Sequence, residues 1–160
     1  ESRRIGLEAT TSYRFASWIK ASFAYTFSDF KFTEFDDNGV DQSGHFIPGN
    51  PEHHLAINLD AFAQSGWFAR GGIQHFSGFF VDNGNTVKNE AYTKSRFSMG
   101  HKADVEEFQW SVFLGLENLF NTKYQANTRI NASNGRYFEP GPPLNFFGGI
   151  SLKYHPFTKK

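Results

Sequence analysis

Apolar and polar residues alternate along most of this 160-residue chain, and residues 110–116, Trp-Ser-Val-Phe-Leu-Gly-Leu, show the pattern clearly. A period of two is typical of a β-strand with two unlike faces, whereas a helix repeats every three to four residues. The pattern therefore predicts an all-β chain of about seven strands. The expected strands span Arg4–Arg14, Trp18–Phe32, His53–Phe62, Trp67–Phe76, Tyr92–Lys102, Phe108–Asn118 and Asn145–Tyr154.

The connections between these strands alternate in length. Short turns are expected near 15–17, 63–66 and 103–107, and long loops rich in Gly, Asn, Asp and Pro near 33–52, 77–91 and 119–144. In an antiparallel meander the short and long connections lie at opposite ends of the sheet. Outer-membrane barrels have this asymmetry, with short periplasmic turns and longer extracellular loops.

The two faces of the expected strands differ in charge. Over residues 5–13, 19–27, 55–61, 67–73, 110–116 and 146–154 one face carries no charge, and the opposite face carries polar and charged residues. A soluble antiparallel sheet with one solvated face would explain this, and so would a barrel wall with lipid on one side and a wet lumen on the other. Under the barrel interpretation the lumen-facing candidates are Lys20, Asp60, Arg70, Gln74, Lys94, Arg96 and Glu117.

Tryptophan placement favours the barrel wall. Trp18, Trp67 and Trp110 all lie within a few residues of a short turn. Such rings settle at the boundary between membrane and water, so we expect these three residues to form an aromatic girdle.

A membrane sheet must close, because unpaired edge N–H and C=O groups in hydrocarbon cost several kcal/mol each. Bacterial single-chain barrels have an even strand number, so an odd set of strands indicates the last third of a larger barrel. A closed small barrel of about eight strands is the alternative. The chain begins at Glu1 without an initiator Met or signal peptide and alternates at once, so we expect a longer protein.

Composition excludes several other functions. Sixteen basic residues balance sixteen acidic ones, so no global field indicates nucleic acid, and the absence of Cys removes thiolate metal sites. Glu117 has no second carboxylate or His at a spacing suited to acid–base catalysis, so no enzyme and no catalytic residue is expected. His53 and His54 are adjacent and would point to opposite faces of a strand, so no metal site or cofactor is predicted.

Four motifs in order resemble TonB-dependent outer-membrane receptors. Residues 117–124, Glu-Asn-Leu-Phe-Asn-Thr-Lys-Tyr, resemble the family's C-terminal signature, and residues 47–54, Ile-Pro-Gly-Asn-Pro-Glu-His-His, resemble its entry to a downward strand. Residues 81–86 are similar to its "DxxN" loop, and residues 136–149 to the approach to its final strand. The resemblance covers about residues 3–154.

The resemblance implies a fold and a function. Residues 1–160 would be the C-terminal portion of a 22-stranded barrel whose N-terminal plug domain is not in this sequence. Such a receptor sits in the bacterial outer membrane and takes up a scarce nutrient, most often a ferric siderophore. Its expected partners are that chelate, the TonB complex, the barrel-assembly machinery and outer-membrane lipid. A passive pore or structural barrel without a plug is the alternative.

Further residues follow from the same interpretation. Aromatic and Arg side chains in the long loops suit planar or anionic chelates, although packing of the loops on themselves would explain them equally well. The candidates are Phe79, Phe80, Tyr124, Arg129, Arg136 and Tyr137. Gly149, Leu152 and Tyr154 fit the assembly signal of the family's last strand, which often ends the chain, whereas here His-Pro-Phe-Thr-Lys-Lys follows.

Overall fold

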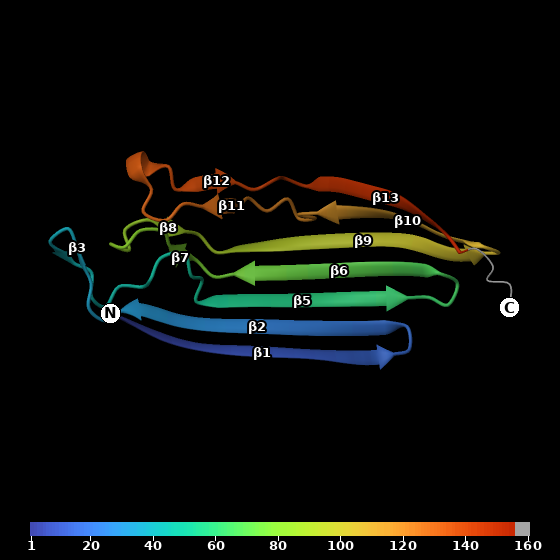
Figure 1. Ribbon diagram of the computed structural model, residues 1–160, viewed down its shortest axis with the longest axis horizontal. Coiled ribbons are helices and arrows are strands. Elements are labelled where there is room, and N and C mark those ends of the chain that lie inside the picture. Colours follow the sequence, from blue (N-terminus) through green and yellow to red (C-terminus); the bar gives the residue numbers. More distant parts are fainter. Residues whose placement is uncertain (156–160) are drawn as a thin grey trace.

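The computed structural model describes residues 1–155, and its main element is a seven-stranded antiparallel sheet in which the strands follow one another in chain order (Figure 1). Every strand predicted from the alternation is present. The strands are β1 Ser2–Ala16, β2 Ile19–Phe32, β5 His53–Phe62, β6 Trp67–Phe76, β9 Tyr92–Val105, β10 Phe108–Glu117 and β13 Asn145–Tyr154. Strand β9 extends three residues into the predicted turn at 103–107, because the turn shrinks to Glu106-Glu107 with Glu106 in the left-handed region at φ 54°.

The long loops contain short elements that the alternation did not predict, because two to four residues are too few to show a period. They are β3 Asp36–Asp37, β4 Val40–Asp41, β7 Phe79–Phe80, β8 Lys88–Asn89, β11 Gln125–Thr128, β12 Phe138–Pro140 and the 3-10 turn η1 Ser133–Gly135. No helix among residues 1–155 is long and apolar enough to cross a membrane. The tail after His155, including Lys159-Lys160, lies outside the described residues.

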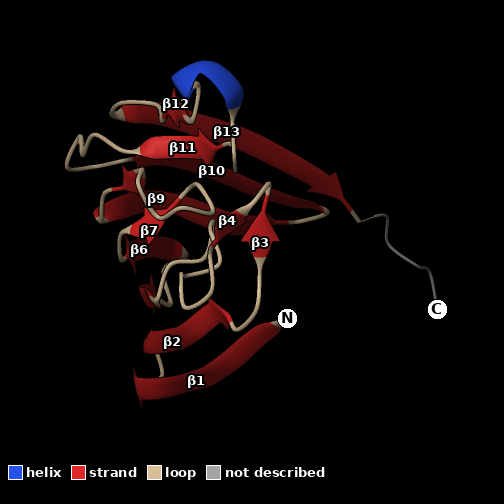
Figure 2. Cartoon of the chain, turned by 90° about the vertical axis from the view of Figure 1, so that its left-hand side faces the viewer, coloured by secondary structure: helices blue, strands red, loops and turns tan. Residues whose placement is uncertain are grey.

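Short and long connections lie at opposite ends of the sheet, as predicted (Figure 1). The N-terminus is at the long-loop end, and β13 ends with Tyr154 at the short-turn end. Seen from the long-loop end, the strands follow a single arc, and the long loops fold over its concave side (Figure 2). The sheet is therefore curved like a piece of a barrel wall.

Strand register places the alternating residues on two distinct faces. Lys20, Asp60 and Arg70 pair in one row across β2, β5 and β6, and with the residues that alternate in step with them they form what we call the polar face. The opposite, apolar face is poorly covered: Ile57 is 45% exposed and Leu114 is 70% exposed.

The sheet has no conventional core. Among residues 1–155, Phe68 and Val81 are the only buried hydrophobic side chains, and Val81 belongs to a loop. A soluble sandwich would bury one face of its sheet against a second layer. An apolar face left open along seven strands is instead what a wall between two different solvents requires.

Candidate functional site

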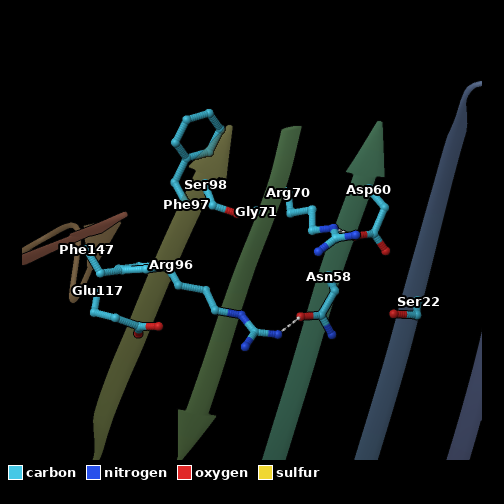
Figure 3. Close-up of a pocket in the computed structure, with 10 residues that line it drawn as sticks. All are labelled: Ser22, Asn58, Asp60, Arg70, Gly71, Arg96, Phe97, Ser98, Glu117 and Phe147. Atoms are coloured by element: carbon cyan, nitrogen blue, oxygen red, sulfur yellow. Dashed lines mark hydrogen bonds and ion pairs between the residues drawn. The ribbon is translucent and has the colours of Figure 1, made fainter. Parts of the chain in front are cut away.

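The middle of the polar face carries paired charges around a groove of about 490 Å³ (Figure 3). Arg70 Nε lies 3.6 Å from Asp60 Oδ1, and an Arg96 N–H donates to Asn58 Oδ1 at 3.1 Å. Glu117 points into the same groove, and among residues 1–155 it makes no ion pair. Of the seven lumen-facing candidates, four line this groove: Asp60, Arg70, Arg96 and Glu117. Lys20 lies beside Asp60 on β2.

Nearer the long loops, four aromatic rings stack in a row that we call the rim ladder: His54, Phe76, Tyr92 and Tyr124. His54 pairs with Phe76, and Phe76 with Tyr92, in the sheet register, and Tyr124 joins from the loop after β10. Successive ring centroids are 4.2, 5.0 and 5.3 Å apart with interplanar angles of 12°, 24° and 22°. A Cβ on Gly141 would lie 2.3 Å from the Tyr124 ring, so this glycine covers the end of the ladder.

Lys94 lies one row below the rim ladder on the polar face, beside Gln74 in the register. Its Nζ is 5.4 Å from the Phe76 centroid and 5.7 Å from the Tyr124 centroid. A cation near the face of an aromatic ring is attracted by the ring quadrupole. The ladder therefore holds the Lys94 ammonium over the upper part of the polar face.

The long loops are tied into one unit, which we call the loop cluster: residues 45–49, 80–87 and 130–131. Asn85 accepts a hydrogen bond from Phe46 N at 2.7 Å and donates one to Phe46 O at 2.9 Å. Asn131 N donates to Val81 O, and Asn83 N donates to Asn131 Oδ1, both at 2.9 Å. The side chain of Val81 in this cluster is fully buried, so the long loops hold one another in a fixed arrangement.

Asp82 organises its loop through local hydrogen bonds. Its carboxylate accepts from the N–H groups of Thr86 and Val87 and from the Thr86 hydroxyl. Burial acts to raise the pKa of Asp82, but these hydrogen bonds favour the charged form and hold the pKa below its usual range. The "DxxN" segment thus has a structural role.

The loop candidates separate into two groups. Phe80 stacks on Phe46 at 6.2 Å inside the loop cluster, and Arg129 Nε donates to Glu139 Oε1 at 3.0 Å. Hydrogen bonds from Asn127 and from Arg129 lower the pKa of Glu139, so this pair is ionised. Phe80 and Arg129 therefore have partners within the loops.

The other loop candidates are Phe79, Tyr124, Arg136 and Tyr137. Phe79 lies in β7, and Tyr124 belongs to the rim ladder. Arg136 is exposed, and among residues 1–155 its side chain makes no ion pair, while Tyr137 contacts the Phe138 ring at 6.1 Å. Ligand contact at these positions stays a prediction.

The Asn-Leu-Phe-Asn segment ends β10 and ties it to the last loop. Asn118 is 3% exposed and has a φ of 53°. Its side-chain amide donates hydrogen bonds to Thr122 O and Pro142 O and accepts one from Thr122 N. Asn121, at φ 51°, accepts from Leu144 N at 3.0 Å. Asn is one of the few residues that tolerate this backbone region, so the two asparagines form a structural corner.

The short-turn end carries the three predicted girdle residues: Trp18 in the turn between β1 and β2, Trp67 on β6 and Trp110 on β10. His101 lies between Trp67 and Trp110, with ring centroids 4.9 and 5.2 Å apart, and Trp18 is 53% exposed. Gly149, Leu152 and Tyr154 lie on β13, where Tyr154 packs on Phe108 at 5.2 Å. Their roles in membrane contact and assembly stay predictions.

Histidine geometry follows the alternation. His53 contacts Tyr25 on the apolar face through a 2.8 Å hydrogen bond to the phenol, and His54 stacks in the rim ladder on the polar face. Among residues 1–155 no group of three His, Asp or Glu residues could hold a metal ion. Sequence reasoning missed the rim ladder, because its members come together only through strand register.

Solved structures similar to this chain include two receptors and a transporter. The ferric citrate transporter FecA matches with a TM-score of 0.81 and 18% identity over 95% of this chain and 24% of its own length. The siderophore receptor PiuA of Acinetobacter baumannii matches with a TM-score of 0.78 and 16% identity, and the ferric preacinetobactin receptor BauA of the same organism with 0.77 and 18%. Coverage is 95% and 94% of this chain and 22% of each receptor.

The sheet, its unlike faces and its sorted loops thus define a segment of a receptor barrel wall, spanning less than a quarter of the structures it matches. Residues 1–119 match the family described as "TonB dependent receptor-like, beta-barrel", and the chain belongs to this family. The predicted family and the all-β fold are confirmed. The family and these neighbours are receptors and transporters, not enzymes, as expected from the sequence.

Proposed function

We propose that this chain is part of an outer-membrane receptor that takes up a ferric chelate, most often a ferric siderophore, with energy delivered through TonB. Residues 1–160 are then the C-terminal portion of the barrel domain, and a plug domain belongs to the complete receptor. The apolar face meets lipid, the polar face lines the lumen, and the long loops form part of the extracellular mouth.

The charge of the polar face is the observation that carries the proposal. The whole chain is neutral, yet cations outnumber carboxylates on the strands of this face. The cations are Arg4, Arg14, Lys20, Arg70, Lys94, Arg96, Lys102 and Lys153, and the carboxylates are Glu8, Asp60, Asp104 and Glu117. A concave wall of one net sign raises the local concentration of ligands of the opposite sign, which suits anionic ferric chelates.

Iron uptake by the complete receptor tests this function. Cells that lack other iron receptors would express the full-length protein and be supplied with radioactive ferric citrate, a ferric tris-catecholate and a ferric hydroxamate. We expect accumulation of at least one complex that stops when the proton-motive force is abolished or TonB is removed. Accumulation that continues without energy would instead indicate a passive pore.

A further inference from the structure

The rim ladder and Lys94 have features that packing alone does not require. Among residues 1–155, Arg70 is the only cation of the polar face with an ion pair, and all cations of this face except Lys94 are exposed to solvent. Lys94 is half-buried, and among residues 1–155 it makes no ion pair. Burying part of a cation without a counter-charge is unfavourable, so an anion from outside these residues would stabilise Lys94 here.

The surroundings of Lys94 provide space and further donors for that anion. A groove of about 200 Å³ lies beside it, lined by Gly72, Gln74, Lys94, Ser95, Arg96, Glu117 and Tyr124. Arg96 donates one N–H to Asn58, so its other N–H groups can donate to a ligand, and Gln74 provides a side-chain amide. Glu117 closes the lower side of the groove, which leaves the cationic side toward the rim ladder.

The ladder also fixes the position of the ammonium. A free lysine side chain loses rotamer entropy when it is immobilised. Here the Phe76 and Tyr124 rings hold Nζ within 5.4 and 5.7 Å of their centroids before any ligand arrives. Part of the side-chain entropy of Lys94 is thus lost when the protein folds and not when the ligand binds, which favours binding.

We propose that Lys94, Arg96 and the rim ladder form a binding site for an anionic oxygen group, a catecholate or carboxylate, on an aromatic ligand. Nζ of Lys94 pairs with the oxygen, and the ring edges and phenol of Tyr124 contact the flat part of the ligand. This inference rests on the proposed function in one respect: the ligand of the site is taken to be the chelate that the receptor transports. An iron-free aromatic anion binds there too.

Two lysines on one strand provide a matched comparison. Lys102 lies on the same face of β9, eight positions from Lys94, and its Nζ is 5.6 Å from the Phe68 ring centroid. At about 3.3 Å per residue the two ammonium groups attach roughly 26 Å apart. Lys94→Gln and Lys102→Gln therefore remove the same charge in similar aromatic surroundings, but only the first touches the proposed site.

The experiment measures affinity in the full-length receptor purified in detergent. The probes are iron-free 2,3-dihydroxybenzoate and the ferric tris-catecholate, followed by quenching of tryptophan fluorescence. We expect Lys94→Gln to weaken both probes about tenfold or more, as loss of one charge-assisted contact should, and Lys102→Gln to change them less than twofold. Tyr92→Leu should weaken them through the ladder, while Tyr92→Phe should not.

The other outcomes either overturn the site or separate it from the transport function. Equal affinities of wild type and Lys94→Gln, equal losses in the two lysine variants, or no binding of either probe by wild type would each refute it. Energised uptake of iron with unchanged Lys94→Gln affinity would refute the site while the transport function stands. Weakened binding in Lys94→Gln with energy-independent uptake would support the site while the transport function fails.

Discussion

An arginine in place of Ile57 tests which solvent each face meets. Ile57 is the fifth of the ten residues of β5 and projects from the apolar face, where it is 45% exposed. Ten residues at about 3.3 Å, tilted by about 40°, span roughly 25 Å across the membrane, the height of the apolar band of such barrels. Ile57 therefore lies near the middle of the bilayer under the proposed function.

The expected cost follows from that depth. An arginine facing lipid at the midplane costs about 2–4 kcal/mol, which falls to about 0–1 near the interfaces. Ser22 provides the matched control, because it is at the same height, faces the 490 Å³ groove and has Asp60 nearby to pair with an arginine. Ser22→Arg should be almost neutral. Asn58 is a poorer control, because it accepts the hydrogen bond from Arg96.

The measurement is the free energy of folding of the complete receptor into lipid vesicles, titrated with guanidinium chloride for wild type and both variants. At about 1.36 kcal/mol per decade, the loss in Ile57→Arg corresponds to about 1.5–3 decades in the folding equilibrium. Similar losses for Ile57→Arg and Ser22→Arg, or a larger loss for Ser22→Arg, would refute the assignment of lipid and lumen to the two faces.

Three further predictions concern packing, pH and the loops. Gly115→Ala should destabilise the receptor by about 1–3 kcal/mol, because its Cβ would lie 2.1 Å from an aromatic ring, whereas Gly71→Ala meets nothing within 4 Å and should be neutral in the same unfolding assay. Because the pKa of Asp82 is lowered on folding, its contribution to loop stability is present above the usual carboxyl pKa of 3.8 and is lost as the pH falls through its lower folded value. A spin label in the 77–91 loop should therefore become more mobile only below about pH 4, and Asp82→Asn should remove that pH dependence; unchanged dependence in the variant would contradict this. Replacing Arg136 and Tyr137 together by Ala should weaken chelate binding at normal surface expression, and unchanged affinity would show that these loop residues only cover the mouth.

Local alternation was enough to predict the strands and their faces. The bounds of β5, β6 and β13 agree with the structure residue by residue, because a change of solvent from one face to the other imposes itself on every second side chain. The same pattern assigned Ile57 and Asp60 to opposite faces of the sheet without any knowledge of the neighbouring strands. The corner at Asn118 was also visible as a motif, although its hydrogen bonds were not.

Tertiary structure decided which residues meet across strands and loops. The rim ladder joins residues 54, 76, 92 and 124, and the loop cluster joins segments near 46, 83 and 131. Arg129, a ligand candidate from the sequence, also donates a hydrogen bond to Glu139 in the structure. The solvent that each side chain meets imposes the alternation residue by residue. Register and loop contacts depend instead on pairing between residues far apart in the chain. The alternating pattern does not specify that pairing, because shifting one strand by two residues leaves the same residues on each face.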